Sequence, residues 1–407
     1  MKQIAVIGFG VVGGGVVELI DENAREIREA LGDDVHVKYI LDLREFPDSP
    51  YGDRVVHDAK LLWDDPEVSL VVETMGGVHP ALEFSLAALS RGKHVVTSNK
   101  ELVAAEGVRL LAEADAHGAA YLYEASVGGG IPLLRPLRTS LSGDRIEAIC
   151  GILNGTTNYI LTRMRDGGVS FDAALAEAQT LGYAERNPSA DVDGLDAQRK
   201  IMILTAAATG ALVRAEAVDT ESTASLTAAD IEAAGRLGGA VRLIGAMRRT
   251  GERVSLSVCP RIVPGDNPLS HVDDVYNAVL VSGAHTGDVM FYGRGAGRYP
   301  TAGAVVSDVI AALGGASRRE ARRVWRTAPD GFVLPPEAAA ERLYVRVADA
   351  PREVVREAAS ALFGDCGTVP GTPQGRTELL TPPRPIVEAR ALLSRLPGRV
   401  EAAIRLL

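Results

Sequence analysis

The sequence predicts an α/β protein with an N-terminal Rossmann-type parallel sheet, a mixed α+β domain after it and a small βαββαβ module at the C-terminal end. Three observations carry this prediction. Short apolar runs alternate with helical patterns over residues 1–130, a glycine-rich turn follows the first run, and longer strand patterns come later. Alternating strands and helices are typical of a parallel sheet covered on both faces.

The first apolar run leads into the turn GFGVVGGGVVELI, in which Gly8, Gly10 and Gly13 have G-x-G-x-x-G spacing. In this motif the glycines allow a tight turn, the approach of a pyrophosphate, and close packing of helix on strand. Val11 and Val12 open the following helix, whose free N–H groups attract phosphate. The turn therefore predicts a dinucleotide site.

Four further strands of the first sheet are predicted by the runs VKYILDL, VSLVVETM, HVVTSN and AYLYEAS, at 37–43, 68–75, 94–99 and 120–126. Helical patterns lie at 79–92 and 101–118. Ligands of such sheets bind beyond the carboxyl ends of the strands. Lys100 begins a helix there, although a helix N-terminus disfavours a cation, so we expect it to face an anionic or carbonyl ligand.

The strand after the glycine helix ends in LDLREF, which offers two different ribose contacts. Asp42 would accept a hydrogen bond from a free 2′-hydroxyl and favour NAD, whereas Arg44 could pair with the 2′-phosphate of NADP. An aspartate at a strand end is also a common turn residue. The sequence leaves these alternatives open.

Lysine is rare in this chain, with six lysines against thirty-seven arginines. Lys200 is retained in the string DVDGLDAQRKIMILTAAATG, four residues after Asp196. An ammonium can release a proton near neutrality when it is desolvated, and a guanidinium cannot. The spacing puts both side chains on one helical face. An exposed ion pair would have the same spacing, but the apolar run 201–204 favours an inward-facing pair.

Composition excludes several classes of partner. The net charge of −10 and the lack of a basic stripe argue against nucleic acid or an anionic membrane surface. Apolar stretches fall short of a membrane span, and strand-like residues directly follow Met1 without a signal-peptide pattern. Three scattered cysteines predict neither a disulfide framework nor a zinc cluster. We expect a cytoplasmic protein.

Six motifs, in family order over about residues 1–330, resemble homoserine dehydrogenase, in its monofunctional form with a C-terminal ACT-like domain. They are GFGVVG at 8–13, SNK at 98–100, YEASVGGGIPLLRPL at 123–137, GILNGTTNYILTRM at 151–164, LGYAERNPSADVDGLDAQRK at 181–200 and FYGRGAGRYPTAGAVVSDV at 291–309. The resemblance implies NAD(P)-dependent hydride transfer between L-homoserine and L-aspartate 4-semialdehyde, within threonine, methionine and isoleucine biosynthesis. It implies no covalent intermediate and no metal in the chemical step.

By this resemblance Lys200 matches the catalytic lysine, and Asp196 and Glu185 match the acids that hold the amino-acid substrate. Lys100 matches a second lysine of the site. Positions near the cofactor are matched by Thr74, Gly182 and Gly295. Without the resemblance, Glu185 would be interpreted as a solvated loop charge and Gly295 as a helix lead-in. Asp191 and Asp193 are expected to be solvated or capping residues.

The stretch EASVGGGIP resembles the monovalent cation site of the family. There Glu124 and the backbone carbonyls of Val127, Gly129 and Ile131 would surround a structural sodium ion. Oxygen ligands suit a hard cation. A plain glycine turn leading into a proline is the alternative.

The rest of the chain predicts three domains: a dinucleotide-binding domain at 1–130 to which 300–327 returns, a substrate and dimerisation domain at 131–310, and an ACT-like regulatory domain at 336–407. The Pro-rich segment at 328–340 is expected to be a linker. ACT-type modules usually carry a glycine where Arg352 stands here, so we expect poor threonine binding. A homodimer or higher homo-oligomer is expected.

The sequence argues against two other functions. A phosphorylating semialdehyde dehydrogenase would need an activated cysteine, but Cys150 and Cys259 lie in apolar strands. A non-catalytic dinucleotide-sensing regulator would bind cofactor without turnover, and the set of Glu185, Asp196 and Lys200 argues against it.

Overall fold

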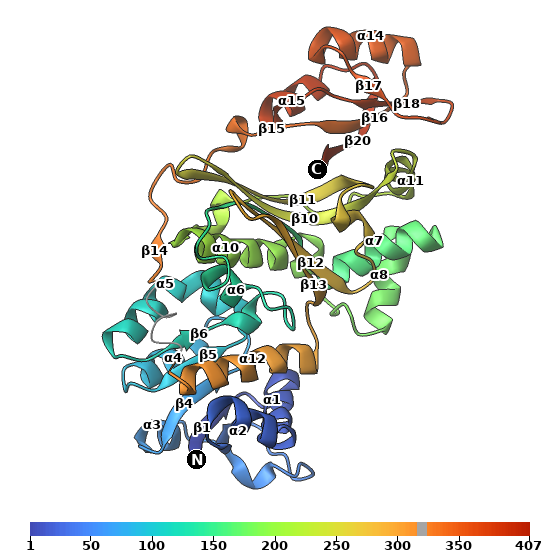
Figure 1. Cartoon of the computed structure of the whole chain (residues 1–407). Coiled ribbons are helices and arrows are strands. Elements are labelled where there is room, and N and C mark those ends of the chain that lie inside the picture. Colours follow the sequence, from blue (N-terminus) through green and yellow to red (C-terminus); the bar gives the residue numbers. More distant parts are fainter. Residues whose placement is uncertain (316–323) are drawn as a thin grey trace. The chain divides into compact units, whose positions relative to one another are not determined.

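The computed structural model describes residues 1–315 and 324–407 (Figure 1). The chain forms two compact units. Unit 1 comprises Met1–Arg145, Met202–Val213 and Phe291–Ala328, and unit 2 comprises Ile146–Ile201, Arg214–Met290 and Pro329–Leu407. Of the segment expected to return to the first domain, residues 316–323 lie outside the described residues.

Within its described residues, unit 1 contains a six-stranded parallel sheet in the order β3-β2-β1-β4-β5-β6. The strands are β1 (Lys2–Ile7), β2 (Val35–Leu41), β3 (Val55–Val56), β4 (Val68–Glu73), β5 (His94–Thr97) and β6 (Tyr121–Leu122). The predicted Rossmann-type sheet is confirmed. The strand expected at 120–126 is too long, because Glu124–Ser126 turn into a 3-10 helix.

Helices of unit 1 cover this sheet. They are α1 (Val11–Glu22), α2 (Ala24–Leu31), α3 (Lys60–Asp64), α4 (Ala81–Leu89), α5 (Lys100–Ala116), α6 (Leu134–Arg138) and α12 (Arg298–Leu313). Helix α12 packs against α1. The two helices share a core in which Val16 and Ile20 of α1 and Val305 of α12 are buried with the apolar side chains of β1 and β4. A pair of short strands, β8 (Ala211–Leu212) and β14 (Arg326–Thr327), also belongs to unit 1.

Unit 2 is built on a mixed sheet in the order β13-β12-β7-β10-β11-β20-β16-β18-β17, with β9 beside β11. Its strands are β7 (Ile146–Ile152), β9 (Asp219–Thr220), β10 (Gly239–Thr250), β11 (Arg253–Pro264), β12 (Tyr276–Gly283), β13 (Gly287–Arg294), β16 (Leu343–Ala348), β17 (Gly367–Thr368), β18 (Arg376–Leu380) and β20 (Arg399–Leu406). Strand β13, whose end enters unit 1, was not predicted. Its sequence GDVMFYGR holds the strand-favouring Val289, Phe291 and Tyr292, but its flanking glycines and partial exposure give no apolar alternation.

The helices of unit 2 are α7 (Gly155–Gly167), α8 (Phe171–Thr180), α9 (Ser189–Val192), α11 (Ala228–Arg236), α14 (Arg352–Phe363) and α15 (Ile386–Leu393). Helix α10 (Leu195–Thr209) begins in unit 2 and ends in unit 1. None of the described helices is long and apolar enough to cross a membrane.

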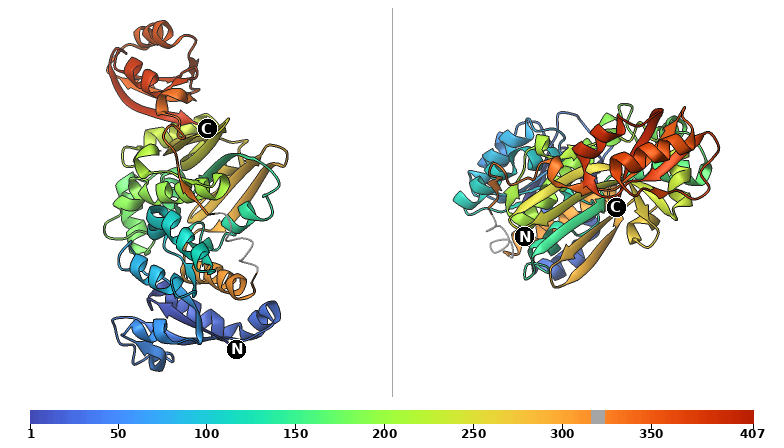
Figure 2. Two further views of the ribbon diagram at one scale, coloured as in Figure 1. Left: turned by 90° about the vertical axis from the view of Figure 1, so that its left-hand side faces the viewer. Right: turned by 90° about the horizontal axis from the view of Figure 1, so that it is seen from above.

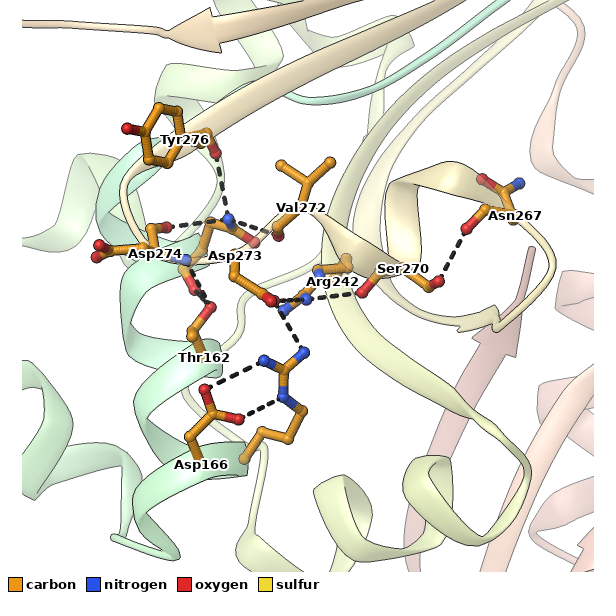
Figure 3. A network of polar contacts seen from close by, with 11 residues as sticks. Thr162, Asp166, Arg242, Asn267, Ser270, Val272, Asp273, Asp274 and Tyr276 are labelled. Atoms are coloured by element: carbon orange, nitrogen blue, oxygen red, sulfur yellow. Dashed lines mark hydrogen bonds and ion pairs between the residues drawn. The ribbon is translucent and has the colours of Figure 1, made fainter.

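A polar network fixes α7 to the loop that precedes β12 (Figure 3). The Asn158 amide donates to the carbonyls of Val272, Asp274 and Tyr276. The Thr162 hydroxyl accepts from the backbone N–H of Asp274 at 3.0 Å. These contacts give backbone groups of the loop hydrogen-bond partners within the protein.

An ionic cluster continues the same anchoring. The fully buried Arg242 guanidinium pairs with Asp273 and donates to the carbonyl of Ser270. Arg165, on α7, pairs with Asp166 and with Asp273. Helix α7 is therefore held along its length.

The C-terminal part of unit 2 has strand order β20-β16-β18-β17. Along the chain, α14 follows β16 and α15 precedes β20. Its edge strand β20 pairs in parallel with β11 at Arg405 and Leu406 and so continues the same sheet. This C-terminal part is the orange-red segment in Figure 2. The expectation that residues 328–340 form a linker is wrong in part. Val254 exchanges backbone hydrogen bonds with Phe332 and Leu334, and β15 (Ala340–Glu341) pairs with β19 (Arg384–Pro385).

Buried charges fasten β20. Arg405 is 2% exposed; it donates to Asp219 at 2.5 Å and pairs with Glu221. Arg261 on β11 is also buried and forms a bidentate ion pair with Glu341. The Arg405 pair links the last strand to β9, and the Arg261 pair links β11 to β15.

We predict that Arg405→Met lowers the free energy of unfolding by about 2–3 kcal/mol, because it removes a buried cationic partner from the partly buried Asp219 and Glu221. Urea denaturation would measure this. The control is Arg399→Met on the same strand, where the 65% exposed Arg399 pairs with Asp349. A surface pair should contribute less than about 1 kcal/mol. Equal losses in both variants would contradict the prediction.

Candidate functional site

The glycine turn lies at the carboxyl end of β1 in unit 1. Gly8 has φ +90°, and Gly10 is the residue before α1. A Cβ on Gly13 would lie 1.9 Å from the carbonyl oxygen of Gly8, so only glycine allows this close approach. Val11 and Val12 are the first residues of α1, as predicted. The backbone N–H groups at this helix end can receive a pyrophosphate.

Asp42 and Arg44 contact each other. The Asp42 carboxylate accepts from the backbone N–H of Phe9 at 2.8 Å and from Arg44 Nε and Nη2, each at 3.0 Å. The Arg44 guanidinium lowers the pKa of Asp42 to about 2. Asp42 thus remains ionised and fixed beside the glycine turn, while Arg44 is largely exposed.

Thr74 ties the loop after β4 to the glycine turn, because its hydroxyl lies 2.8 Å from the carbonyl oxygen of Gly8 and 3.0 Å from that of Ile7. Lys100 is the first residue of α5, directly after Asn99, whose side chain caps that helix. Both predicted residues therefore stand at carboxyl ends of the sheet.

Glu73, at the end of β4, was not predicted as a functional residue. It is 1% exposed; its carboxylate accepts from the hydroxyl of Thr97 at 2.5 Å and from the N–H of Met75 at 2.7 Å. Asn99 donates its N–H to the same Thr97 hydroxyl and its amide to the carbonyl of Gly77. Glu73 therefore links the end of β4, next to Thr74, with the end of β5, three residues before Lys100.

Burial raises the pKa of Glu73 from 4.5 to about 7. Between these values the folded protein holds a proton that the unfolded chain releases, so the free energy of unfolding falls as pH rises. We predict that the free energy of unfolding of the parent protein falls by on the order of 3 kcal/mol between pH 4.5 and 7.5, and that Glu73→Gln removes this fall. Thermal unfolding of both proteins across this range would test it. Parallel profiles would contradict the assigned burial effect.

Lys200 and Asp196 form a buried pair on α10 in unit 2, at 8% and 5% exposure. Lys200 Nζ donates to Asp196 Oδ2 and to the carbonyl oxygen of Leu153, both at 2.7 Å. The predicted inward-facing helical pair is thus present. An ammonium has three N–H groups, and these two contacts orient two of them.

Asn154 joins this pair to a further acid. Its amide Nδ2 donates to Asp196 Oδ2 at 2.9 Å and to Asp191 Oδ1 at 2.6 Å. The expectation that Asp191 is a solvated or capping residue is wrong, because the fold brings it to Asn154. Asp193 accepts from the Ser222 hydroxyl at 2.9 Å.

Glu185 and Gly182 lie in the exposed segment between α8 and α9. Gly182 has φ +77°, and the carbonyl of Glu185 accepts from the Gln179 amide at 3.1 Å. The predicted residues therefore form two sets. Lys200, Asp196, Glu185 and Gly182 belong to unit 2, and the others belong to unit 1.

The predicted cation site centres on Glu124, which is buried. Its carboxylate accepts from the backbone N–H groups of Leu133, Leu134 and Arg135 at 2.5, 2.9 and 2.6 Å. A carboxylate offers about four lone-pair positions, so this cap of α6 leaves room for about one more partner. A cation would therefore depend mainly on backbone carbonyls.

The surroundings of this segment are tightly packed. A Cβ on Gly129 would lie 2.6 Å from the carbonyl oxygen of Gly295, which brings Gly295 to the predicted cation segment. Asp308 accepts from the N–H of Glu124 and pairs with Arg135. Burial, with the nearby Glu124 charge, raises the pKa of Asp308. Among the described residues, no cluster of three or more His, Cys, Asp or Glu side chains could hold a metal ion.

The cysteines offer no activated nucleophile. Burial raises the pKa of the Cys150 thiol to about 12 and also raises that of Cys259 and Cys366. A nucleophilic cysteine needs a lowered pKa. The chemistry of a phosphorylating semialdehyde dehydrogenase is therefore not supported.

Hydride transfer between an alcohol and a carbonyl compound needs a bound nicotinamide dinucleotide and a group that moves a proton. The glycine turn on a Rossmann-type sheet suits the first need, and the buried lysine suits the second. A nicotinamide-dependent oxidoreductase is the class of protein that this fold and these residues define.

Comparison with known proteins gives the family. The model "Homoserine dehydrogenase, NAD binding domain" matches residues 8–124, and the model "Homoserine dehydrogenase" matches residues 132–310. A homoserine dehydrogenase of Synechocystis is 45% identical over 320 residues, which cover 77% of this chain and 73% of that protein.

Solved structures agree. A homoserine dehydrogenase from Thiobacillus denitrificans has TM-score 0.89 and 34% identity, and the match covers 100% of this chain and 98% of that one. A hyperthermophilic archaeal homoserine dehydrogenase in complex with NADPH has TM-score 0.66 and 29% identity, covering 77% of this chain and 98% of that one.

The chain belongs to the homoserine dehydrogenase family. It is an NAD(P)-binding oxidoreductase with homoserine dehydrogenase activity in amino-acid biosynthesis. The expected family, fold class and enzymatic function are confirmed, and the non-catalytic regulator is excluded.

Proposed function

We propose that Lys200 is the proton donor and acceptor in the interconversion of L-homoserine and L-aspartate 4-semialdehyde. The observation that carries this is the buried Lys200 ammonium, held by Asp196 and by the Leu153 carbonyl. A bound nicotinamide supplies or accepts the hydride. Lys200 then protonates the alkoxide that forms from the aldehyde, or takes the hydroxyl proton of homoserine in the reverse direction. Such a positioned acid contributes about two to four powers of ten in rate.

The substrate also carries an α-ammonium, which a buried site must pair with carboxylate. We assign this role to Glu185, with Asp196 contacting the substrate and orienting Lys200. Lys100, at the start of α5, is assigned to the same site close to cofactor and substrate. Support for these roles comes from the family resemblance.

For the cofactor, the proposed contacts are the glycine turn for the pyrophosphate and Asp42 or Arg44 for the ribose. Thr74, Gly182 and Gly295 are assigned to the nicotinamide end. Their support is positional: Thr74 bonds the glycine turn. Incubation of the purified protein with L-homoserine and each oxidised cofactor would test the reaction and the cofactor together.

A structural sodium ion would be held by the carbonyls of Val127, Gly129 and Ile131 and by the remaining acceptor position of Glu124. The ion would neutralise the buried Glu124 charge and take no part in hydride transfer. Hard cations of this kind take oxygen ligands.

The proposed domains are the dinucleotide-binding domain at 1–130 with 300–327, the substrate domain at 131–310 and the ACT-like regulatory domain at 336–407. We further propose a cytoplasmic homodimer or higher homo-oligomer. In the C-terminal module Arg352 donates to the carbonyls of Thr372, Pro373 and Arg376. This side chain therefore ties the first turn of the module to the loop before β18, which supports poor threonine binding.

We predict that Lys200→Arg lowers kcat by about two or more powers of ten, because a guanidinium keeps the charge but does not release its proton at working pH. Steady-state kinetics with L-homoserine would measure it. Cofactor binding at the glycine turn should change little.

The matched control is Lys60→Arg, at an exposed position of unit 1. It should leave kcat unchanged, since the chain already favours arginine at exposed sites. If Lys200→Arg folds and turns over at a near-normal rate, the lysine is a structural partner of Asp196, and the proton must come from Lys100 or water.

We predict that NAD is used at least as well as NADP, because the ionised Asp42 is fixed beside the turn and would repel a 2′-phosphate. Arg44→Ala should weaken NADP use further and leave NAD use nearly unchanged. Values of kcat/KM for both cofactors measure this. A preference of the parent protein for NADP above about tenfold, or about 1.4 kcal/mol, would overturn the prediction.

A further inference from the structure

The junction between β7 and α7 holds the Lys200–Asp196 pair from both sides. Leu153 and Asn154 are consecutive residues there. The carbonyl of Leu153 accepts from the Lys200 ammonium, and the amide of Asn154 donates to the Asp196 carboxylate. An acceptor thus meets the cation and a donor meets the anion. This is what two charges need when they are removed from water.

Both the nitrogen and the oxygen of the Asn154 side-chain amide form hydrogen bonds. Besides the two N–H bonds to Asp191 and Asp196, its Oδ1 accepts from the backbone N–H of Thr157 at 2.8 Å and from the Thr157 hydroxyl at 2.9 Å. The first of these bonds caps α7. Because Oδ1 is fixed by the cap, the amide nitrogen has one direction, which is toward the two carboxylates.

The two carboxylates would repel each other without this amide. Both accepting oxygens lie within hydrogen-bond distance of one nitrogen, and like charges this close disfavour ionisation of both groups. The N-terminal end of α7 carries a partial positive charge that also favours the anions. The neutral amide of Asn154 offsets this repulsion together with the Lys200 ammonium, which is paired with Asp196.

Helix α7 itself cannot easily shift. It is anchored by Asn158, Thr162 and Arg165, and the contact of Thr162 with the loop before β12 is drawn in Figure 3. At its first residue, a Cβ on Gly155 would lie 2.7 Å from the carbonyl oxygen of Val275. The backbone that carries Asn154 is therefore packed closely against the loop before β12.

We propose that Asn154 is a positioning residue for proton transfer. It fixes Asp191 beside Asp196 and directs Asp196 Oδ2 at Lys200, so that the remaining N–H of the ammonium has one orientation toward the reacting oxygen. This inference rests on the proposed role of Lys200.

Two variants separate positioning from capping. Asn154→Ser keeps a side chain that can cap α7 but cannot reach both carboxylates. Asn154→Asp keeps the cap acceptor and replaces the amide with a third carboxylate. We expect kcat to fall about tenfold or more in the first variant and further in the second, because small misplacements of a catalytic group cost about that much. KM for the cofactor should be unchanged in both.

The control is Ser170→Ala, which removes the cap of α8 in the same unit. It should lower the unfolding temperature while kcat stays at the parent value. The inference is overturned if both Asn154 variants keep kcat within about twofold of the parent, or if their loss of kcat is matched by a loss of folded protein in thermal unfolding.

The Lys200→Arg variant distinguishes an error in the inference about Asn154 from an error in the proposed role of Lys200. If Lys200→Arg is inactive while both Asn154 variants are normal, the inference about Asn154 alone is wrong. If Lys200→Arg is active, the proposed function is wrong, whatever the Asn154 variants do.

Discussion

The buried Lys200–Asp196 pair is the interaction on which the arrangement of unit 2 depends. A buried ion pair is stable only when both charges receive further hydrogen bonds, and here these come from Leu153 and Asn154. That requirement fixes α10 against the β7–α7 junction. Strand β7 is in turn held between β10 and β12, and α7 is held by the loop before β12. The mixed sheet thus serves as the rigid support of this buried pair.

Much of the fold and part of this site could be predicted from local patterns. The glycine turn has fixed spacing and follows an apolar strand, and Asp196 and Lys200 lie four residues apart, so one helix places them together. Functional residues that lie within one helix or one turn can be recognised from their spacing in the sequence. The scarcity of lysine added weight to Lys200, because a retained lysine among arginines suggests a proton that must move.

Groups assembled by tertiary contacts could not be predicted. Asn154 is forty-two residues before Asp196, with which it bonds, and nothing in NGTTN distinguishes its side chain from an ordinary cap. Glu73 was predicted only as part of the strand at 68–75, because its bond to Thr97 depends on the neighbouring strand β5. In both cases the missing information is which elements become neighbours in space.

The C-terminal strand adds a constraint of the same kind. Since β20 pairs with β11 and Arg405 binds Asp219 and Glu221, the module at the C-terminal end shares a sheet with the substrate region. Thr220, between those two acids, accepts from the Gln198 amide on α10 at 2.9 Å. Gln198 lies between Asp196 and Lys200 in the chain. Hydrogen bonds therefore connect β20 to α10 through the short strand β9.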